Sequence, residues 1–276
     1  MDTYQFALSM RTALYQCGQV ARALQGQVTP ENKAPDSPHQ TSTEVSVVDR
    51  LCQEILLLRA QEVAPGVDVQ SEELADCPPE ILALFDRGPH RYALILDPLD
   101  GTGEYLAGGS RYGHMLGLLD QETGRMDCGM IYFPAAFRLY LGVRGRGAWV
   151  QDGLGGDLRP MPRCAPPRTV EDVKRLRPED YGAFRRLGFG VVPPESASAA
   201  YELTRVAEGD LGAMAMRHFH GHDSAISSVI IEELGGLVVV EGGAPVRYDA
   251  GMPRMPLVVL SLDPEYAQGL AETLGA

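Results

Sequence analysis

The sequence is poor in cysteine and in positive charge, and it has no long apolar run. Its five cysteines are scattered, their number is odd, and no two of them form a C-x-x-C pair. This pattern predicts free thiols in a reducing compartment and argues against a disulfide framework or a structural zinc site. No segment approaches the roughly 18 consecutive apolar residues of a membrane-spanning helix.

Two further absences bear on location and partners. The start, MDTYQFALSM, has neither the basic residues nor the apolar core of a signal peptide, so we expect a cytoplasmic protein. Lysine and arginine number 24 against 37 acidic residues, which gives a net charge of -13. This charge argues against a nucleic-acid polymer or an anionic membrane as the main partner. A small anionic substrate stays compatible with it, because a bound cation can reverse the local sign.

The 276 residues, 45% of them hydrophobic, suffice for one large domain or two smaller lobes. Closely spaced strands with Gly-rich turns in the middle predict an antiparallel meander, and alternating helices and strands after residue 178 predict an α/β part. A loop is expected over 27–42. The expected helices are 3–25, 46–60, 178–187, 196–208, 222–234 and 263–274. The expected strands are 67–69, 92–96, 114–119, 126–133, 138–143, 148–150, 188–192, 212–216, 237–240 and 256–261.

The stretch LDPLDGTGEY, residues 96–105, follows an apolar run that predicts a buried strand. Because Pro98 cannot continue the hydrogen bonding of the strand, we expect the backbone to turn just after Asp97. Such a turn can gather Asp97, Asp100 and the Leu99 carbonyl around one point, an all-oxygen set that suits a hard cation such as Mg²⁺. The alternative is an ordinary turn with local Asx hydrogen bonds. The two interpretations weigh about equally on this stretch alone.

Three other places carry acids in a similar setting. Glu72 follows a short strand in SEE, Asp49 begins a helix in VSVVDR, and Asp223 opens a helix in HDSAISSVIIEELGG. The helix dipole stabilises Asp223 there, so simple capping is the alternative role of that residue.

Taken together, DPLDGT (97–102), SEE (71–73) and HGHDSAISSVIIEELGG (220–236) resemble the inositol monophosphatase family of lithium-sensitive, Mg²⁺-dependent phosphatases. The matches follow the order of the family over nearly the whole chain. The resemblance implies an α+β or α/β fold, the layered αβαβα sandwich of sugar phosphatases. It assigns an antiparallel sheet and the metal site to residues 1–155. Residues 156–276 would contribute the third metal aspartate and the substrate pocket. A homodimer is expected from the family.

The resemblance also assigns roles. Glu72, Asp97 and the Leu99 carbonyl would hold the first of two or three Mg²⁺ ions, and Asp97, Asp100 and Asp223 the second. Substrate would be bound by Gly101, Thr102, Asp223, Met216 and His222, with the N–H groups of Gly101 and Thr102 on the phosphate. Glu72, Thr102 and Asp49 would be the catalytic network that positions a water molecule. Two cations roughly 3.5–4 Å apart can clamp a phosphate and activate water for in-line attack.

Departures from the family pattern leave the substrate open. His222 stands in place of a tryptophan, and Met216 in place of a glutamate that contacts sugar hydroxyls. We expect a small sugar or polyol phosphate. The alternative is a 3′(2′),5′-bisphosphate nucleotidase, whose usual motif resembles Leu99, Glu104 and Tyr105 but has a lysine where Gly103 stands. A non-catalytic protein that binds phosphate ligands is a further alternative.

Two compositional features have competing interpretations. His218, His220 and His222 alternate, which allows a zinc site if the segment is extended, although pocket or core histidines are favoured. Residues 159–186 hold eight of the 24 basic residues. They could form a patch for a second phosphate, but a solvated surface is the favoured interpretation.

Overall fold

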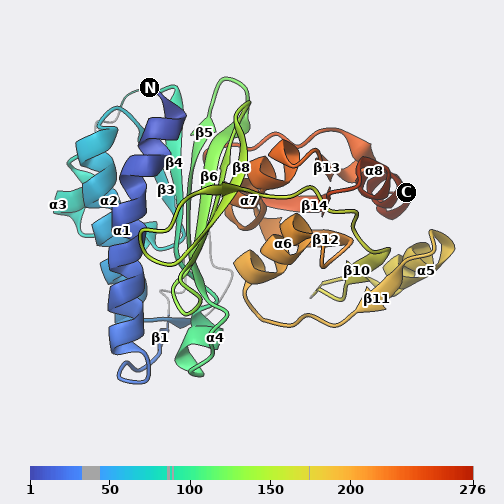
Figure 1. The fold of residues 1–276 in the computed structure, drawn as a ribbon, viewed down its shortest axis with the longest axis horizontal. Helices are drawn as coiled ribbons and strands as arrows, with labels where there is room; N and C mark the ends of the chain where they lie inside the picture. Colours follow the sequence, from blue (N-terminus) through green and yellow to red (C-terminus); the bar gives the residue numbers. More distant parts are fainter. Residues whose placement is uncertain (33–43, 86–87, 89, 174, 276) are drawn as a thin grey trace.

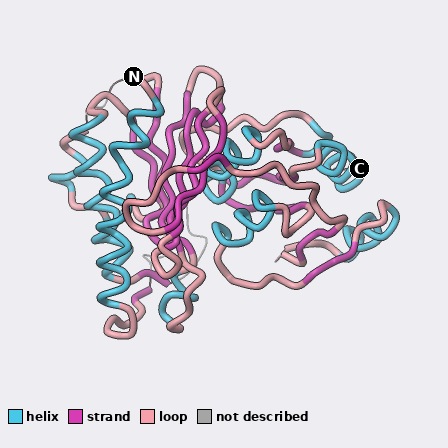
Figure 2. The backbone as a smooth tube through the Cα atoms, in the orientation of Figure 1, coloured by secondary structure: helices cyan, strands magenta, loops and turns pink. Residues whose placement is uncertain are grey.

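The computed structural model describes residues 1–32, 44–85, 88, 90–173 and 175–275, which form five layers (Figure 1). A helical pair covers a seven-stranded sheet, a second pair separates it from a five-stranded sheet, and a third covers the far side (Figure 2). The three pairs are α1 (Thr3–Leu24) with α2 (Val47–Val63), α6 (Ala199–Glu208) with α7 (Gly221–Glu233), and α5 (Pro178–Arg186) with α8 (Pro264–Leu274). The predicted αβαβα sandwich is confirmed.

The seven-stranded sheet runs in the order β3-β4-β5-β6-β7-β8-β9. Only β3 and β4 are parallel, and the others form the predicted antiparallel meander. Its strands are β3 (Asp68–Ser71), β4 (Tyr92–Asp100), β5 (Gly113–Asp120), β6 (Arg125–Phe133), β7 (Arg138–Val143), β8 (Gly147–Asp152) and β9 (Arg159–Pro160). Strand β9 was not predicted from the sequence. Nor was the short pair β1 (Glu31–Asn32) and β2 (Glu44–Val45), which lies at the predicted loop; residues 33–43 are outside the described part.

Strand β4 continues past the point where a turn was predicted. Asp97 pairs with Met115 and Asp100 with Gly113, so β4 has one more residue than β5 over this interval. This is a β-bulge, and it accommodates Pro98 inside a strand, which a regular ladder does not. Residues three apart in a regular strand point to opposite faces, but the extra residue lets Asp97 and Asp100 point to the same side.

The five-stranded sheet has the order β11-β10-β12-β14-β13. Strand β10 is parallel to β11 and β12, whereas β14 is antiparallel to its neighbours β12 and β13. The strands are β10 (Thr169–Glu171), β11 (Gly190–Val192), β12 (Ala213–His220), β13 (Leu237–Val240) and β14 (Arg254–Ser261). Strand β10 was not predicted, and β12 continues four residues beyond its predicted end, up to the start of α7.

Helix α7 lies between the two sheets, and every residue from Gly221 to Ile231 is buried, its three serines included. It lies against the backbone of the large sheet at two glycines. A Cβ on Gly129 would lie 2.0 Å from the Ile226 carbonyl oxygen, and one on Gly142 would lie 2.8 Å from the Ile230 nitrogen. This close contact fixes the first turn of α7, with Asp223, beside the carboxyl end of β4.

Three apolar clusters fill the spaces between the five layers. All five cysteines are free, as predicted. Among the described residues, no helix combines the length and the apolar character needed to cross a bilayer.

Candidate active site

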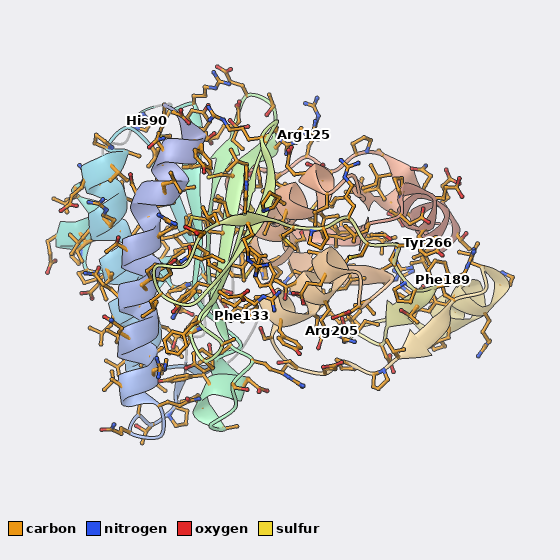
Figure 3. The ribbon with its side chains drawn as sticks, in the orientation of Figure 1. His90, Arg125, Phe133, Phe189, Arg205 and Tyr266 are labelled. Atoms are coloured by element: carbon orange, nitrogen blue, oxygen red, sulfur yellow. The ribbon has the colours of Figure 1, made fainter. Side chains whose placement is uncertain are left out.

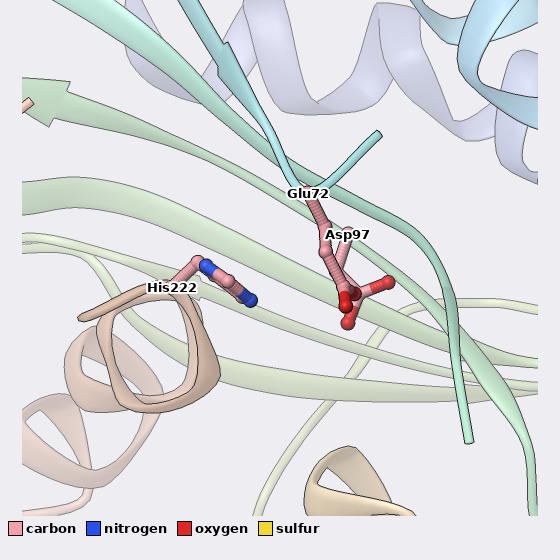
Figure 4. A group of neighbouring side chains, drawn as sticks. All are labelled: Glu72, Asp97 and His222. Atoms are coloured by element: carbon pink, nitrogen blue, oxygen red, sulfur yellow. The ribbon is translucent and has the colours of Figure 1, made fainter. Parts of the chain in front are cut away.

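Four acidic side chains meet at the bulge of β4 in two overlapping groups. One group contains Asp97, Asp100 and Asp223, each of which has one carboxylate oxygen within 4.8 Å of those of the other two. The other contains Glu72, Asp97 and a ring nitrogen of His222, within the same distance (Figure 4). Glu72 comes from the end of β3, Asp97 and Asp100 from β4, and His222 and Asp223 from the first turn of α7. The tertiary structure thus brings together the whole predicted acidic metal set.

Asp100 is held by the start of α6. Its Oδ2 accepts hydrogen bonds from the Ser198 hydroxyl and, at 3.0 Å, from the Ala200 amide. Burial nevertheless raises the pKa of Asp100 to about 6, and the charge of Glu72 adds to the shift. The carboxylate is oriented by these bonds but is not neutralised by them.

Asp223 is buried with less compensation. Its Oδ2 accepts no hydrogen bond from the described residues, and its Oδ1 lies 3.5 Å from Nε2 of His222. Burial raises the pKa of Asp223 well above its ordinary value, and the charges of Glu72 and Asp100 raise it further. A buried carboxylate with an unsatisfied oxygen beside other carboxylates fits a site that a cation completes.

Asp49 lies behind this group and has all the partners that it needs. Its Oδ2 accepts from the backbone N–H (2.8 Å) and hydroxyl (2.7 Å) of Ser46, the N-cap residue of α2. Its Oδ1 lies 3.0 Å from the Thr102 hydroxyl, which is also 3.1 Å from the Leu99 carbonyl. Burial raises the pKa of Asp49 to about 6. Its carboxylate therefore orients Thr102 and, through it, the peptide between the two β4 aspartates.

The acids form one wall of a pocket of about 580 Å³. The lining on the side of the four acids consists of Glu72, Asp97, Leu99, Asp100, Gly101, Thr102 and Asp223. Gly101 has φ +80°, and a Cβ there would lie 2.9 Å from Cβ of Ser198, so this turn requires glycine. The oxygen donors Asp97, Asp100, Asp223 and Glu72 match the ligands that Mg²⁺ and similar hard cations take in proteins, so the residues fit such an ion.

Other predicted contacts lie elsewhere. Met216 is fully buried in the core between the sheets and is not among the residues that line the pocket. Tyr105 is also fully buried, and its hydroxyl donates to the Ala21 carbonyl. Within the described part of the chain, the candidate metal groups include His222 but not His218 or His220, so the three-histidine zinc site does not form.

The basic stretch 159–186 contributes little to the pocket. Of its described basic residues, only Arg175 lines it. Arg168 instead lies over the rings of Phe189 and Tyr266. Figure 3 labels these two aromatic residues, which lie in the outer part of the molecule. The interpretation as solvated surface is the better one.

Sequence reasoning missed three residues that shape the site. Ser198 orients Asp100, Ser46 orients Asp49, and Glu171 lines the pocket together with Glu104, Glu195 and Glu202. These four glutamates are called the distal wall of the pocket. Oε2 of Glu171 is buried without a hydrogen-bond partner among the described residues. Burial and then the charge of Glu202 raise the pKa of Glu171 to about 8. The S-x-x-D capping box around Ser46 was readable in the sequence. Glu171 had no such signal, because β10 was not predicted.

Comparison with known proteins decides the family. The model of the inositol monophosphatase family matches residues 7–274. The chain belongs to the inositol monophosphatase family. One relative is the inositol-1-monophosphatase of Mesorhizobium japonicum, 28% identical over 221 residues that cover 75% of this chain and 76% of the relative. Another is the fructose-1,6-bisphosphatase/inositol-1-monophosphatase of Aquifex aeolicus, 26% identical and covering 82% and 81%.

A solved structure shares the fold. An IMPase/NADP phosphatase complexed with Mg²⁺ and phosphate superposes with a TM-score of 0.74 at 17% identity, covering 98% of this chain and 95% of that one. The members of the family named here are phosphatases, that is, phosphoric monoester hydrolases, and the predicted enzyme class is confirmed at that level.

Proposed function

We propose that the protein hydrolyses a small phosphomonoester, a sugar or polyol phosphate, with divalent cations held by the four buried acids. The observation that carries this proposal is the convergence of Asp97, Asp100 and Asp223, with oxygens within 4.8 Å of one another, on the wall of a 580 Å³ pocket. So much buried like charge is tolerable in a folded protein only if protons or cations neutralise it.

The acids would hold two cations. Asp97, Asp100 and Asp223 would bind one, and Glu72, Asp97 and the Leu99 carbonyl the other; the resemblance implies Mg²⁺ for both, with a third ion as an option. When bound, such cations neutralise the phosphate, lower the pKa of a water and stabilise the departing alkoxide.

The protein groups would position the reactants. Gly101 and Thr102 line the pocket, and their N–H groups would bind phosphate oxygens. Thr102 and Glu72 would align the attacking water, and Asp49 would orient the Thr102 hydroxyl through its 3.0 Å contact. Water attacks phosphorus as the ester P–O bond breaks, and the products are the alcohol and inorganic phosphate.

The distal wall favours hydroxyl groups over a second phosphate. It is lined by Glu104, Glu171, Glu195 and Glu202, and Arg175 is the one basic residue among its described lining. A second phosphate would face these carboxylates, whereas a hydroxyl can bond with a carboxyl group such as Glu171. Because Tyr105 is buried beneath the site, it offers no ring for base stacking. The bisphosphate nucleotidase alternative is therefore not favoured.

Phosphate release from a substrate panel tests the proposal. The panel is inositol 1-phosphate, fructose 1,6-bisphosphate, histidinol phosphate and adenosine 3′,5′-bisphosphate, each with and without Mg²⁺. We expect Asp97→Asn to lower kcat/KM at least about 100-fold, because Asp97 belongs to both cation groups. Asp120→Asn, at another buried strand aspartate outside the pocket, is the matched control. Undiminished activity of Asp97→Asn would contradict the cation mechanism. Tight phosphate binding without turnover would support the non-catalytic alternative.

Other expectations stay predictions. Inhibition by lithium, a homodimer and the division at residues 155/156 come from the resemblance, and a cytoplasmic location comes from the cysteine pattern and the start of the sequence.

A further inference from the structure

A histidine lies within the proposed cation group that contains Glu72 and Asp97. A ring nitrogen of His222 lies within 4.8 Å of carboxylate oxygens of both Glu72 and Asp97 (Figure 4). Figure 4 shows the imidazole reaching from the start of α7 toward the two carboxylates, which approach each other from β3 and β4. All three side chains are buried.

Packing determines the direction of the His222 ring. The side chain is 1% exposed and stacks on His220, with ring centroids 5.7 Å apart and planes at 12°. His220 is itself held near the Met252 carbonyl, 3.4 Å from its Nδ1. The backbone of α7 is fixed by its contacts with Gly129 and Gly142. The imidazole therefore has little freedom to turn away from Glu72 and Asp97.

The spacing of the three donors suits one ion. Nitrogen and oxygen ligands lie about 2.0–2.2 Å from a bound transition metal, so two ligands of one ion are at most about 4.4 Å apart. The observed limit of 4.8 Å requires only small side-chain shifts to reach that value. Closure by a few tenths of an ångström is within ordinary side-chain motion.

The two cation groups differ in chemistry. Asp97, Asp100 and Asp223 offer oxygen alone, which suits Mg²⁺. Glu72, Asp97 and His222 offer two oxygens and an imidazole nitrogen. Imidazole suits Fe²⁺, Ni²⁺ and Zn²⁺, contributes less to binding of Mn²⁺, and contributes little to binding of Mg²⁺, which prefers oxygen and keeps its waters.

From this difference we infer that His222 is a metal ligand. Together with Glu72 and Asp97, it makes this cation site selective for a transition-metal dication such as Zn²⁺, with Mn²⁺ favoured less strongly. The oxygen-only group keeps its preference for Mg²⁺. The inference rests on the proposed function, because it assigns an ion to one of the two proposed cation groups.

Pulsed electron paramagnetic resonance of the full chain loaded with Mn²⁺ tests the ligand directly. We expect a nitrogen modulation that changes frequency when histidine is labelled with ¹⁵N, and that is lost in His222→Phe. His218→Phe is the matched control, since it removes a nearby exposed imidazole that is not in the group, and it should keep the signal. Thermal unfolding checks that both variants fold, and His222→Gln provides a second variant that keeps a polar side chain.

Calorimetric titration supplies an independent measurement. His222→Phe should weaken Zn²⁺ binding about 10–100-fold and Mn²⁺ binding by less, while Mg²⁺ binding changes less than about 3-fold. Mn²⁺ binding without a nitrogen signal, or with unchanged affinity in His222→Phe, would overturn the inference and leave the proposed function intact. If wild-type protein binds neither Mn²⁺ nor Mg²⁺, the cation-dependent function fails as well. The two failures are therefore distinguishable.

Discussion

At the scale of single residues, environment separates aspartates that look alike in the sequence. Asp49 accepts hydrogen bonds on both carboxylate oxygens, from Ser46 and Thr102, so each of its oxygens has a hydrogen-bond donor. Asp223 has an oxygen that accepts none from the described residues. The difference supports the proposed roles, a positioning role for Asp49 and a ligand role for Asp223, although both lie at the start of helices and both are buried.

Ser198 provides a test at this scale. Its hydroxyl donates to Asp100 and accepts from the Tyr201 amide as the N-cap of α6. Ser198→Ala should cost about 1 kcal/mol of stability and weaken Mg²⁺ binding roughly 10-fold, because Asp100 loses an orienting bond. Asp263→Ala removes the N-cap of α8 and should lower stability equally without affecting Mg²⁺. Chemical denaturation and calorimetry measure the two quantities. Equal Mg²⁺ affinity in both variants would contradict the role of Ser198.

At the scale of elements, the site depends on the bulge in β4 and on the position of α7. The bulge turns Asp97 and Asp100 to one side, and α7 brings His222 and Asp223 to meet them. Neither element is held by polar contacts alone. Helix α7 packs directly against the sheet backbone because Gly129 and Gly142 have no side chains there.

Gly129→Ala tests whether this close packing of α7 against the sheet positions the site. The added methyl group would meet the Ile226 carbonyl, so α7 must move, and we expect a loss of about 1–3 kcal/mol with weaker cation binding. Gly269→Ala in α8 is the control, because no described atom lies within 4 Å of the position that its methyl group would take. That change should be neutral or stabilise the helix by up to about 1 kcal/mol. Wild-type cation affinity in Gly129→Ala would show that α7 does not fix the site.

At the scale of the whole molecule, the buried acids of the site lower the stability of the folded protein when no cation is bound. Burial raises the pKa of Asp49 and Asp100 from 3.8 to about 6 and that of Glu171 to about 8, and it raises the pKa of Asp223 as well. A raised carboxyl pKa means that the folded state binds protons more tightly than the unfolded chain. The stability from these protons is present at low pH and is lost as pH rises through the folded pKa.

The cation-free protein should therefore lose thermal stability between about pH 4 and pH 8, with Asp49 and Asp100 contributing up to about pH 6 and Glu171 above it. His114 acts in the opposite direction, since burial lowers its pKa to about 4, but it is one group against four. Saturating Mg²⁺ should remove much of the loss, because a bound cation favours the charged carboxylates. Melting temperatures from about pH 4.5 to 7.5, with chelator and with Mg²⁺, measure the effect. A cation-free melting temperature that rises across this range would contradict it.

The sequence by itself determined the family, the layered fold and the four acids. DPLDGT, SEE and the helix after His222 have fixed local spacing, and hydrophobic periodicity located every helix of the three pairs to within three residues. These are local signals, set by the backbone geometry of a few neighbouring residues. The short strands β9 and β10 were missed because they contain too few residues to show a period.

Only the tertiary structure decided which side chains share the site. It placed Met216 in the core, brought Glu171 to the distal wall and turned His222 toward Glu72 and Asp97. The physical reason is that side-chain direction depends on a bulge, on strand register and on how closely a helix packs against a sheet. Each of these is fixed by contacts between segments far apart in the chain, and such contacts leave no periodic trace in the sequence.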